Sequence, residues 1–386
     1  MNRSENPFTP GAGVLPPELA GRRGVLEDGD VLAARTIAHC YERGLMLIGP
    51  RGVGKTVLLK YMAEASRLRG VIPVREEIRR DGGDIEQLSR RLKDALCSID
   101  FKSRIKNKVN AAFATLGNFV KQFSINIGEL GLSVEPRVSV GGSGNMEYDL
   151  SEVLLSVAMA AKESETAVGL YIDELQNLDL STMSGIIVAL HSAAQDSLPL
   201  YLVGSGLPTI RALVGKSKTY AERMFVYHDI GALDADATAD AVCAPLRSRN
   251  AGIDSAAISA IYEVSKGYPF FVQECGYAAW NKAEGSIISS DDIKAVLPTV
   301  LQNLDRNFFD VRFDRVSPRE REFLSAMSVL GDQPSFNAVA KEMGGTLASL
   351  SRVRASLIKK GMVYSPSLGK LAYTVPMFGE YMKRVM

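Results

Sequence analysis

Eight consecutive residues near the start of the chain have the types and spacing of a phosphate-binding loop. Glycines here allow a curled backbone whose N–H groups point inward, a lysine neutralises phosphate charge, and a threonine hydroxyl is a hard oxygen ligand for Mg²⁺. The motif G-x-x-x-x-G-K-[ST] is matched at every position by Gly49-Pro50-Arg51-Gly52-Val53-Gly54-Lys55-Thr56. It predicts that these residues, with Val57 of the next turn, bind the phosphates of a nucleoside triphosphate, and that Thr56 is a ligand of Mg²⁺.

The segments on both sides of this loop are those that a phosphate-binding loop needs. The apolar run 45–48 predicts a buried strand that leads into the loop. After Thr56, apolar residues recur at helical spacing over residues 57–63. A helix that starts there adds the positive end of its dipole to the anion site. The alternative is a chance glycine-rich turn, and the order of strand, loop and helix argues against it.

A pair of acidic residues follows another apolar strand. Residues 168–172 predict a buried strand, and Asp173 and Glu174 come directly after it. At such a position one carboxylate holds hydrated Mg²⁺, the role expected for Asp173. The other orients or deprotonates the attacking water, the role expected for Glu174. Acidic residues at strand ends are also common helix caps. The phosphate-binding motif in the same chain favours the hydrolytic interpretation.

Two further side chains are catalytic candidates beside Lys55 and Glu174, each with an ordinary alternative. Ser205 follows an apolar run that predicts a strand, and a polar group there can hydrogen-bond the γ-phosphate or the attacking water. A glycine–serine turn explains Ser205 equally well. Arg223 precedes another predicted strand, and it could reach the site of a neighbouring subunit to neutralise phosphate charge. A surface arginine is the alternative.

The bulk composition limits the class of protein. At 386 residues the chain is too long for one compact core, and 46% hydrophobic with 23% charged residues is typical of a globular protein. A net charge of +1 gives no global attraction to nucleic acid or anionic membranes. The cysteines and histidines are scattered, which argues against zinc, disulfide or serine–histidine chemistry. With no long apolar stretch and no signal peptide, we expect a cytoplasmic protein without a membrane partner.

Changes of pattern along the chain predict four segments. Residues 1–27 are rich in proline and glycine and predict an extended N-terminal arm. Strands alternate with helices over residues 28–233, which predicts an α/β parallel sheet covered on both faces. Residues 234–312 have a purely helical pattern and predict a lid, and residues 313–386 predict a separate C-terminal domain.

An insertion interrupts the predicted core at about 98–148. It contains a basic stretch at 102–108, and at 123–134 an apolar pattern whose parity flips. A hairpin with a turn at Gly128-Glu129, or a β-bulge, would produce that flip. The basic stretch could contact nucleic acid, but a solvated helix face is the favoured interpretation.

The C-terminal segment has the pattern of a winged helix. It predicts three helices and then two strands that form a wing, at 318–330, 336–343, 347–360, 362–364 and 371–375. From residue 317 onward, ten Lys/Arg and five Asp/Glu leave +5, and the rest of the chain is therefore −4. We expect this segment to bind double-stranded DNA, with a protein-binding role as the alternative. The candidate DNA contacts are Arg352, Ser356, Lys359 and Lys370.

Together these motifs resemble the AAA+ superfamily of P-loop ATPases and, within it, the bacterial and archaeal group similar to the origin-recognition complex. Nearly the whole chain is covered by the resemblance. Its motifs are an adenine-side box, a D-E-x-Q element and a G-x-G-L-P turn, here Ala20-Gly21-Arg22, Asp173-Glu174-Leu175-Gln176 and Gly204-Ser205-Gly206-Leu207-Pro208. The resemblance implies an AAA+ parallel-sheet core, a helical lid and a C-terminal winged-helix domain. It also implies that ATP is the nucleotide and that Arg22 lies on its adenine side.

The lid departs from the pattern of that group. Initiator ATPases carry an arginine at the start of a lid helix, where this chain has Lys266-Gly267-Tyr268-Pro269-Phe270-Phe271. The stretch resembles the G-x-P element of STAND-type signalling NTPases, which implies that Pro269 packs by the nucleotide base. A proline at the first turn of a buried helix is the structural alternative.

The combined prediction is a DNA-binding ATPase of low turnover that uses Mg²⁺ and acts as a nucleotide-dependent switch. The alternative is a STAND-like regulatory ATPase whose winged helix binds a protein. A homo-oligomer is a further possible assembly, since Arg223 could act on a neighbouring subunit.

Overall fold

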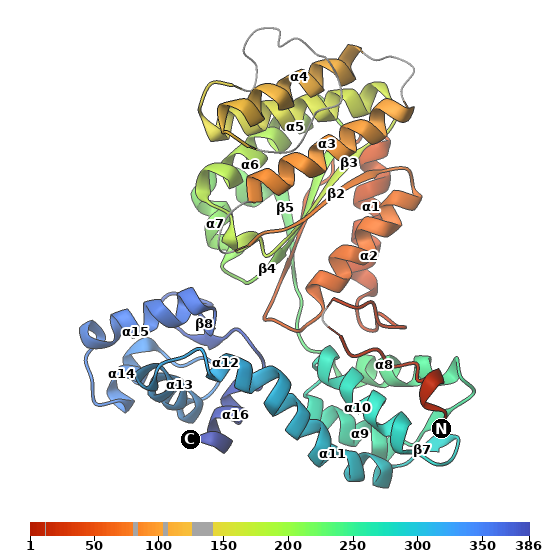
Figure 1. Ribbon diagram of the computed structural model, residues 1–386, viewed down its shortest axis with the longest axis vertical. Helices are drawn as coiled ribbons and strands as arrows, with labels where there is room; N and C mark the ends of the chain where they lie inside the picture. Colours follow the sequence, from red (N-terminus) through yellow and green to blue (C-terminus); the bar gives the residue numbers. More distant parts are fainter. Residues whose placement is uncertain (12, 80–83, 103–106, 126–141) are drawn as a thin grey trace. The chain divides into compact units, whose positions relative to one another are not determined.

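The computed structural model describes residues 1–11, 13–79, 84–102, 107–125 and 142–386 (Figure 1). The chain divides into two compact units. The sheet unit contains residues 24–48 and 55–229, and the lid unit contains residues 1–23, 49–54 and 230–386. The turn expected at Gly128-Glu129 and the basic residues Arg104 and Lys106 lie outside the described residues.

The sheet unit is built on a five-stranded parallel sheet. Its strands are β1 (Gly44–Ile48), β2 (Ile72–Glu77), β3 (Val168–Asp173), β4 (Leu200–Gly206) and β5 (Phe225–Asp229). Their order is β2-β3-β4-β1-β5, and each pairing is parallel. The strand that leads into the phosphate-binding loop, β1, is thus an interior strand, and β4 separates it from β3. The predicted α/β core with a parallel sheet is confirmed.

Helices cover both faces of this sheet, as its buried strands require (Figure 1). α1 (Arg23–Ile37) and α2 (Lys55–Leu68) lie on one face. The opposite face is covered by α3 (Asp84–Lys102), α5 (Met146–Glu163) and α6 (Leu180–Gln195), with α4 (Asn107–Gln122) outside α5. α7 (Ile210–Ser217) follows β4. The five residues of β1 are all buried, so this strand is held from both sides.

Two parts of the sheet unit differ from the sequence predictions. The first helix begins at Arg23, before the predicted start of the core at residue 28, and it ends at Ile37, before His39, which has a left-handed φ of 55°. The insertion contains a helix that the prediction missed, α4. Val109, Phe113 and Leu116 recur along it at helical spacing and are buried in the core of the unit.

The lid is mainly helical, as predicted. It comprises α8 (Ala235–Arg247), α9 (Ser255–Ser265), α10 (Pro269–Lys282) and α11 (Ser290–Leu304). The expectation of a purely helical segment is wrong at one place, where β6 (Gly252–Ile253) and β7 (Ile287–Ile288) form a short parallel pair. These strands follow α8 and α10, so the pair joins two connections of the lid.

The N-terminal arm, which includes the short helix η1 (Arg3–Glu5), is fastened to α10 of the lid. Phe8 is 2% exposed, and a Cβ on Gly276 would lie 2.5 Å from its ring. The Trp280 indole N–H donates to the carbonyl of Asn2 over 2.7 Å. The arm is therefore a packed part of the lid unit.

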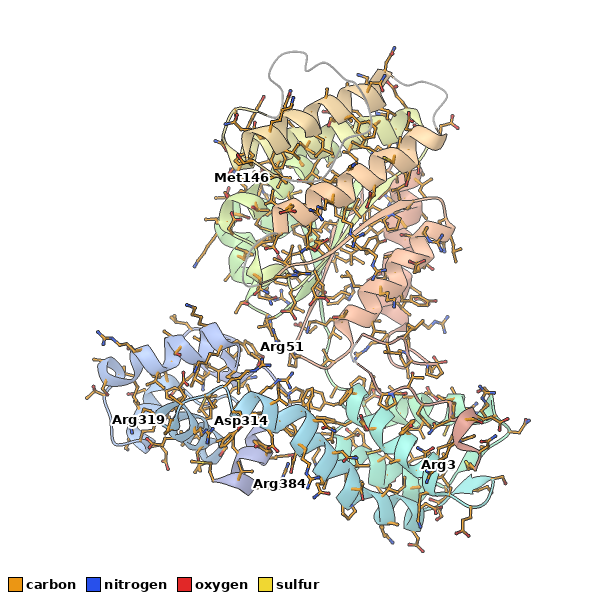
Figure 2. The ribbon with its side chains drawn as sticks, in the orientation of Figure 1. Arg3, Arg51, Met146, Asp314, Arg319 and Arg384 are labelled. Atoms are coloured by element: carbon orange, nitrogen blue, oxygen red, sulfur yellow. The ribbon has the colours of Figure 1, made fainter. Side chains whose placement is uncertain are left out.

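The C-terminal segment follows the lid through a π-helix, η4 (Asp305–Asp310), and α12 (Val311–Phe313). Its elements are α13 (Pro318–Leu330), α14 (Phe336–Glu342), α15 (Leu347–Lys360), β8 (Val363–Tyr364), β9 (Ala372–Tyr373) and α16 (Phe378–Val385). The predicted order of three helices and two antiparallel strands is present, and α16 was not predicted. Arg384 of α16, labelled in Figure 2, forms a 2.5 Å ion pair with Asp305. Among the described residues, no helix combines the length and apolar character needed to span a membrane.

Glu320 is a buried carboxylate that joins α13 to α15. Burial alone would raise its pKa. Hydrogen bonds from Lys360 and Ser356, each of 2.6 Å, and from Ser317 outweigh that effect and lower the pKa to about 2 from its ordinary value of 4.5. A carboxyl whose pKa falls on folding stabilises the fold above its unfolded pKa, and this stabilisation is lost as pH falls toward its folded pKa.

We therefore expect Glu320→Gln to lower the free energy of unfolding at pH 7 by about 2 kcal/mol. The difference from the parent should shrink to about half or less at pH 3, because the ionised form then contributes less. Denaturant titrations at the two pH values measure both effects. The control is Glu322→Gln on the same helix, since Glu322 is exposed and pairs with Arg319. Equal losses at both pH values would contradict this account.

Candidate functional site

At each of the three glycines of the phosphate-binding loop, the structure disfavours a residue with a side chain. A Cβ on Gly49 would lie 2.0 Å from the carbonyl oxygen of Ile230, so any side chain there meets main chain. Gly52 and Gly54 have φ of +82° and +94°, a conformation that side chains disfavour. The loop from Gly49 to Gly54 belongs to the lid unit, and Lys55 begins α2 in the sheet unit.

Arg22, the predicted base-side residue, braces the loop from within the lid unit. Its guanidinium donates to the carbonyl of Gly231 and, over 3.4 Å, to the carbonyl of Val53. Burial lowers the pKa of Arg22, and the nearby Asp234 carboxylate opposes that effect. Arg22 therefore ties the phosphate-binding loop to the segment before α8.

The G-x-P element also has a close main-chain contact in the lid unit. A Cβ on Gly267, whose φ is +71°, would lie 1.9 Å from the carbonyl oxygen of Leu233. The N–H of Leu233 donates to the carbonyl of Gly267 over 2.7 Å. Pro269 is half-buried and occupies the first turn of α10, where a missing N–H costs nothing. Its place in the first turn of a helix therefore explains this proline whether or not a nucleotide base packs against it.

A connected set of side chains in the sheet unit contains several of the other predicted site residues. The Thr56 hydroxyl donates to Asp173 over 2.5 Å. The Ser205 hydroxyl donates to the other oxygen of Asp173, which also accepts from the N–H of Glu174 over 2.8 Å. Lys55, at the start of α2, is 6% exposed. The structure thus brings Thr56, Asp173 and Ser205 together.

This oxygen set suits Mg²⁺. A hydroxyl and a carboxylate are hard ligands, and Mg²⁺ bound with phosphates keeps several waters, so it needs few protein oxygens. Ser205 is fully buried at the end of β4, which extends to Gly206 beyond the strand predicted from sequence. Its hydrogen bond to Asp173 accounts for a polar side chain at this buried position without a direct contact to phosphate.

Glu174 and its neighbour Gln176 lie just after β3. Glu174 adopts a left-handed conformation, with φ 52° and ψ 38°, before the short helix η2 (Leu175–Asn177). The Gln176 amide donates to the Glu174 carboxylate over 2.5 Å. Sequence analysis gave Gln176 no role. Its position in the D-E-x-Q element was the signal that could have identified it.

Other candidates are spread over both units. Pro50 and Arg51 are half-buried. Arg51 is labelled in Figure 2. Its main-chain N–H donates to the carbonyl of Thr374, beside β9, over 2.7 Å. Val57 is half-buried in the first turn of α2. Arg223 is exposed in the short helix η3 (Ala221–Met224), where its neighbours Ala221 and Met224 are buried.

Three of the four predicted DNA contacts are exposed. Arg352 and Lys359 lie seven residues apart on α15, two helical turns along one face, and Lys370 lies in the loop between β8 and β9. Ser356 differs from them, because it is half-buried and its hydroxyl donates to Glu320. We therefore assign Ser356 to the packing of α15 against α13 and leave it out of the proposed contact set.

Comparisons with known proteins cover the chain unevenly. Residues 306–382 match a family described as a domain of unknown function, DUF8462. No curated protein matches the chain.

Solved structures similar to the chain include Cdc6p from Pyrobaculum aerophilum, at 15% identity and TM-score 0.48, with 99% of this chain and 96% of that chain covered. Orc1 from Aeropyrum pernix, in complex with DNA, has 13% identity, TM-score 0.48 and coverage of 95% and 93%. The Holliday junction branch migration motor RuvB from Thermotoga maritima has 15% identity, TM-score 0.45 and coverage of 96% and 99%. The parallel strand order β2-β3-β4-β1-β5 defines the fold of the sheet unit independently of these similarities.

The approach of Ile230 to Gly49 gives a test of the loop geometry. We expect Gly49→Ala to lower the free energy of unfolding by about 2 kcal/mol or more, because main chain has to move. Gly24→Ala is the matched control: a Cβ there meets nothing within 4 Å, and alanine in a helix should add up to about 1 kcal/mol. Denaturant titration compares the two variants, and a neutral Gly49→Ala would refute the close approach.

Proposed function

We propose that this protein binds ATP with Mg²⁺ and hydrolyses it slowly as a nucleotide-dependent switch. The observation that carries the proposal is the 2.5 Å hydrogen bond between Thr56 and Asp173. It joins the last residue of a complete phosphate-binding motif to the carboxylate expected to hold hydrated Mg²⁺. Buried Lys55 lies beside Thr56 at the positive end of the α2 dipole.

In this proposal each residue has a defined task. Main-chain N–H groups of the loop and the Lys55 ammonium hold the phosphates. Thr56 and Asp173 hold Mg²⁺, which when bound neutralises charge that develops on the phosphates. Glu174 accepts the proton of the attacking water or orients that water. Ser205 holds Asp173 in place through its hydroxyl.

The base side of the nucleotide is assigned to the lid unit. Arg22 braces the loop at Val53 and Gly231, and Pro269 starts α10. Both residues lie in the motifs that resemble nucleotide-side elements of known ATPases. They support adenine as the base and ATP as the nucleotide.

Slow turnover and a switch role are supported by two features. The start of α10 has no arginine between Lys266 and Phe271, so this turn offers no guanidinium to a γ-phosphate. The hydrogen bond from Arg51 to Thr374 connects the phosphate-binding loop to the C-terminal segment. A ligand that reshapes the loop would act on this bond, which links nucleotide state to the C-terminal segment. Arg223, from an exposed turn, is the candidate to supply charge to a neighbouring copy.

Glu174→Gln tests the hydrolytic step. We expect Mg-ATP affinity to stay within about threefold of the parent and single-turnover hydrolysis to fall by about a hundredfold or more, because the amide cannot take a proton. Calorimetry and a phosphate-release assay measure the two quantities. Glu163→Gln, at an exposed glutamate at the end of α5, is the control. Hydrolysis by Glu174→Gln at the parental rate would remove Glu174 as the base.

For the C-terminal segment we propose a winged-helix role on double-stranded DNA, with contacts from Arg352 and Lys359 on α15 and Lys370 on the wing. The charge of +5 over residues 317–386 and the exposure of these three side chains support this role. The second candidate is a STAND-like regulatory ATPase whose C-terminal segment binds a protein. The hydrogen bond from Arg51 to Thr374 favours this second candidate, because the C-terminal segment there contacts protein within the same chain.

A salt titration separates the two roles. Each phosphate contact adds about 0.9 to the slope of log affinity against log salt, so the double variant Arg352→Ala/Lys359→Ala should reduce the slope by about 2. Lys294→Ala, at an exposed lysine of α11, should leave the slope unchanged. Fluorescence anisotropy with a labelled duplex measures the slope. Absence of duplex binding by the parent at low salt would contradict the DNA role and favour the protein-binding one.

A further inference from the structure

The turn after β3 is anchored so firmly that the position of Gln176 is fixed. Leu175 is fully buried, and a Cβ on Gly204 of β4 would lie 2.4 Å from its side chain. The Asn177 amide donates to the carbonyl of Ile78 over 3.0 Å. Gln176 lies between Leu175 and Asn177 on η2, so the main-chain position from which its side chain extends is fixed.

Both ends of the Gln176 amide are engaged. Its oxygen accepts from the N–H of Leu207 over 2.9 Å, and its nitrogen donates to the Glu174 carboxylate over 2.5 Å. A main-chain N–H can only donate and a carboxylate can only accept, so a flipped amide would lose both bonds. Its orientation is therefore determined by chemistry.

The last residue of β4, Gly206, lies close to this side chain. A Cβ on Gly206 would lie 2.0 Å from the Gln176 oxygen, so a larger residue at this position would displace the amide. Ser205, one residue earlier, bonds Asp173. The end of β4 thus reaches the acidic pair by two routes, one to Asp173 through Ser205 and one to Glu174 through Gln176.

We propose that Gln176 is a positioning residue that holds the Glu174 carboxylate and couples it to the end of β4. The inference rests on the function proposed above, in which Glu174 acts on water. The N–H donated by Gln176 orients the Glu174 carboxylate. A shift of Gly206 or Leu207 moves the amide and, with it, the carboxylate.

Two substitutions at this position test the inference. Gln176→Met keeps length and removes both hydrogen bonds; we expect single-turnover hydrolysis to fall about tenfold or more, with Mg-ATP affinity within about twofold of the parent. Gln176→Glu keeps an oxygen that can accept from the N–H of Leu207 but replaces the donor to Glu174 by an acceptor, so we expect hydrolysis to fall as in Gln176→Met, again with Mg-ATP affinity within about twofold of the parent. Gln195→Met, at an exposed glutamine at the end of α6, is the control.

The outcomes distinguish the positioning role of Gln176 from the role of Glu174 as the base. Parental hydrolysis in Gln176→Met or in Gln176→Glu would overturn the positioning role while Glu174→Gln remains slow. Parental hydrolysis in Glu174→Gln would instead overturn the proposed base itself. If Gln176→Met does not fold, Gln176→Glu decides, because its carboxylate still accepts from the N–H of Leu207.

Discussion

The hydrogen bond between Thr56 and Asp173 is the interaction on which the candidate Mg²⁺ site in the sheet unit depends. Thr56 is fixed because α2 starts at Lys55, and Asp173 is fixed because it ends a buried interior strand. Two elements that are 117 residues apart in sequence meet at this bond. A parallel sheet makes such a meeting possible, since the carboxyl ends of neighbouring strands share one edge.

In the lid unit, contacts between main-chain groups hold the corresponding segments together. Gly49 approaches Ile230, Gly267 approaches Leu233, and Arg51 donates to the carbonyl of Thr374. None of these contacts depends on a side chain that could rotate away. The phosphate-binding loop, the start of α10 and the C-terminal segment are consequently linked by main-chain contacts.

Short-range patterns predicted much of this molecule. The phosphate-binding motif, the Asp173–Glu174 pair and the strand–helix alternation each depend on a few neighbouring residues, so the parallel sheet and α2 were predictable. The cap of α13 was also predictable, because Ser317, proline and Glu320 have the spacing of a capping box, and that box is present.

Contacts between distant elements were not predictable in this way. Ser356 has the right spacing to share a face with Arg352, yet it bonds Glu320, because the packing of α15 on α13 decides which polar side chain is covered. Gln176 is an ordinary glutamine in sequence, and only the end of β4 gives it partners. Helix α4 of the insertion was missed because the basic stretch and the parity flip were given more weight than the apolar stripe of this helix.

The most direct test of the central claim is a calorimetric titration of the folded protein with Mg-ATP, repeated on Lys55→Ala. The account predicts saturable binding to the parent, accompanied by a higher unfolding temperature, and no detectable binding to the variant. Failure of the folded parent to bind, or equal binding by both proteins, would contradict it.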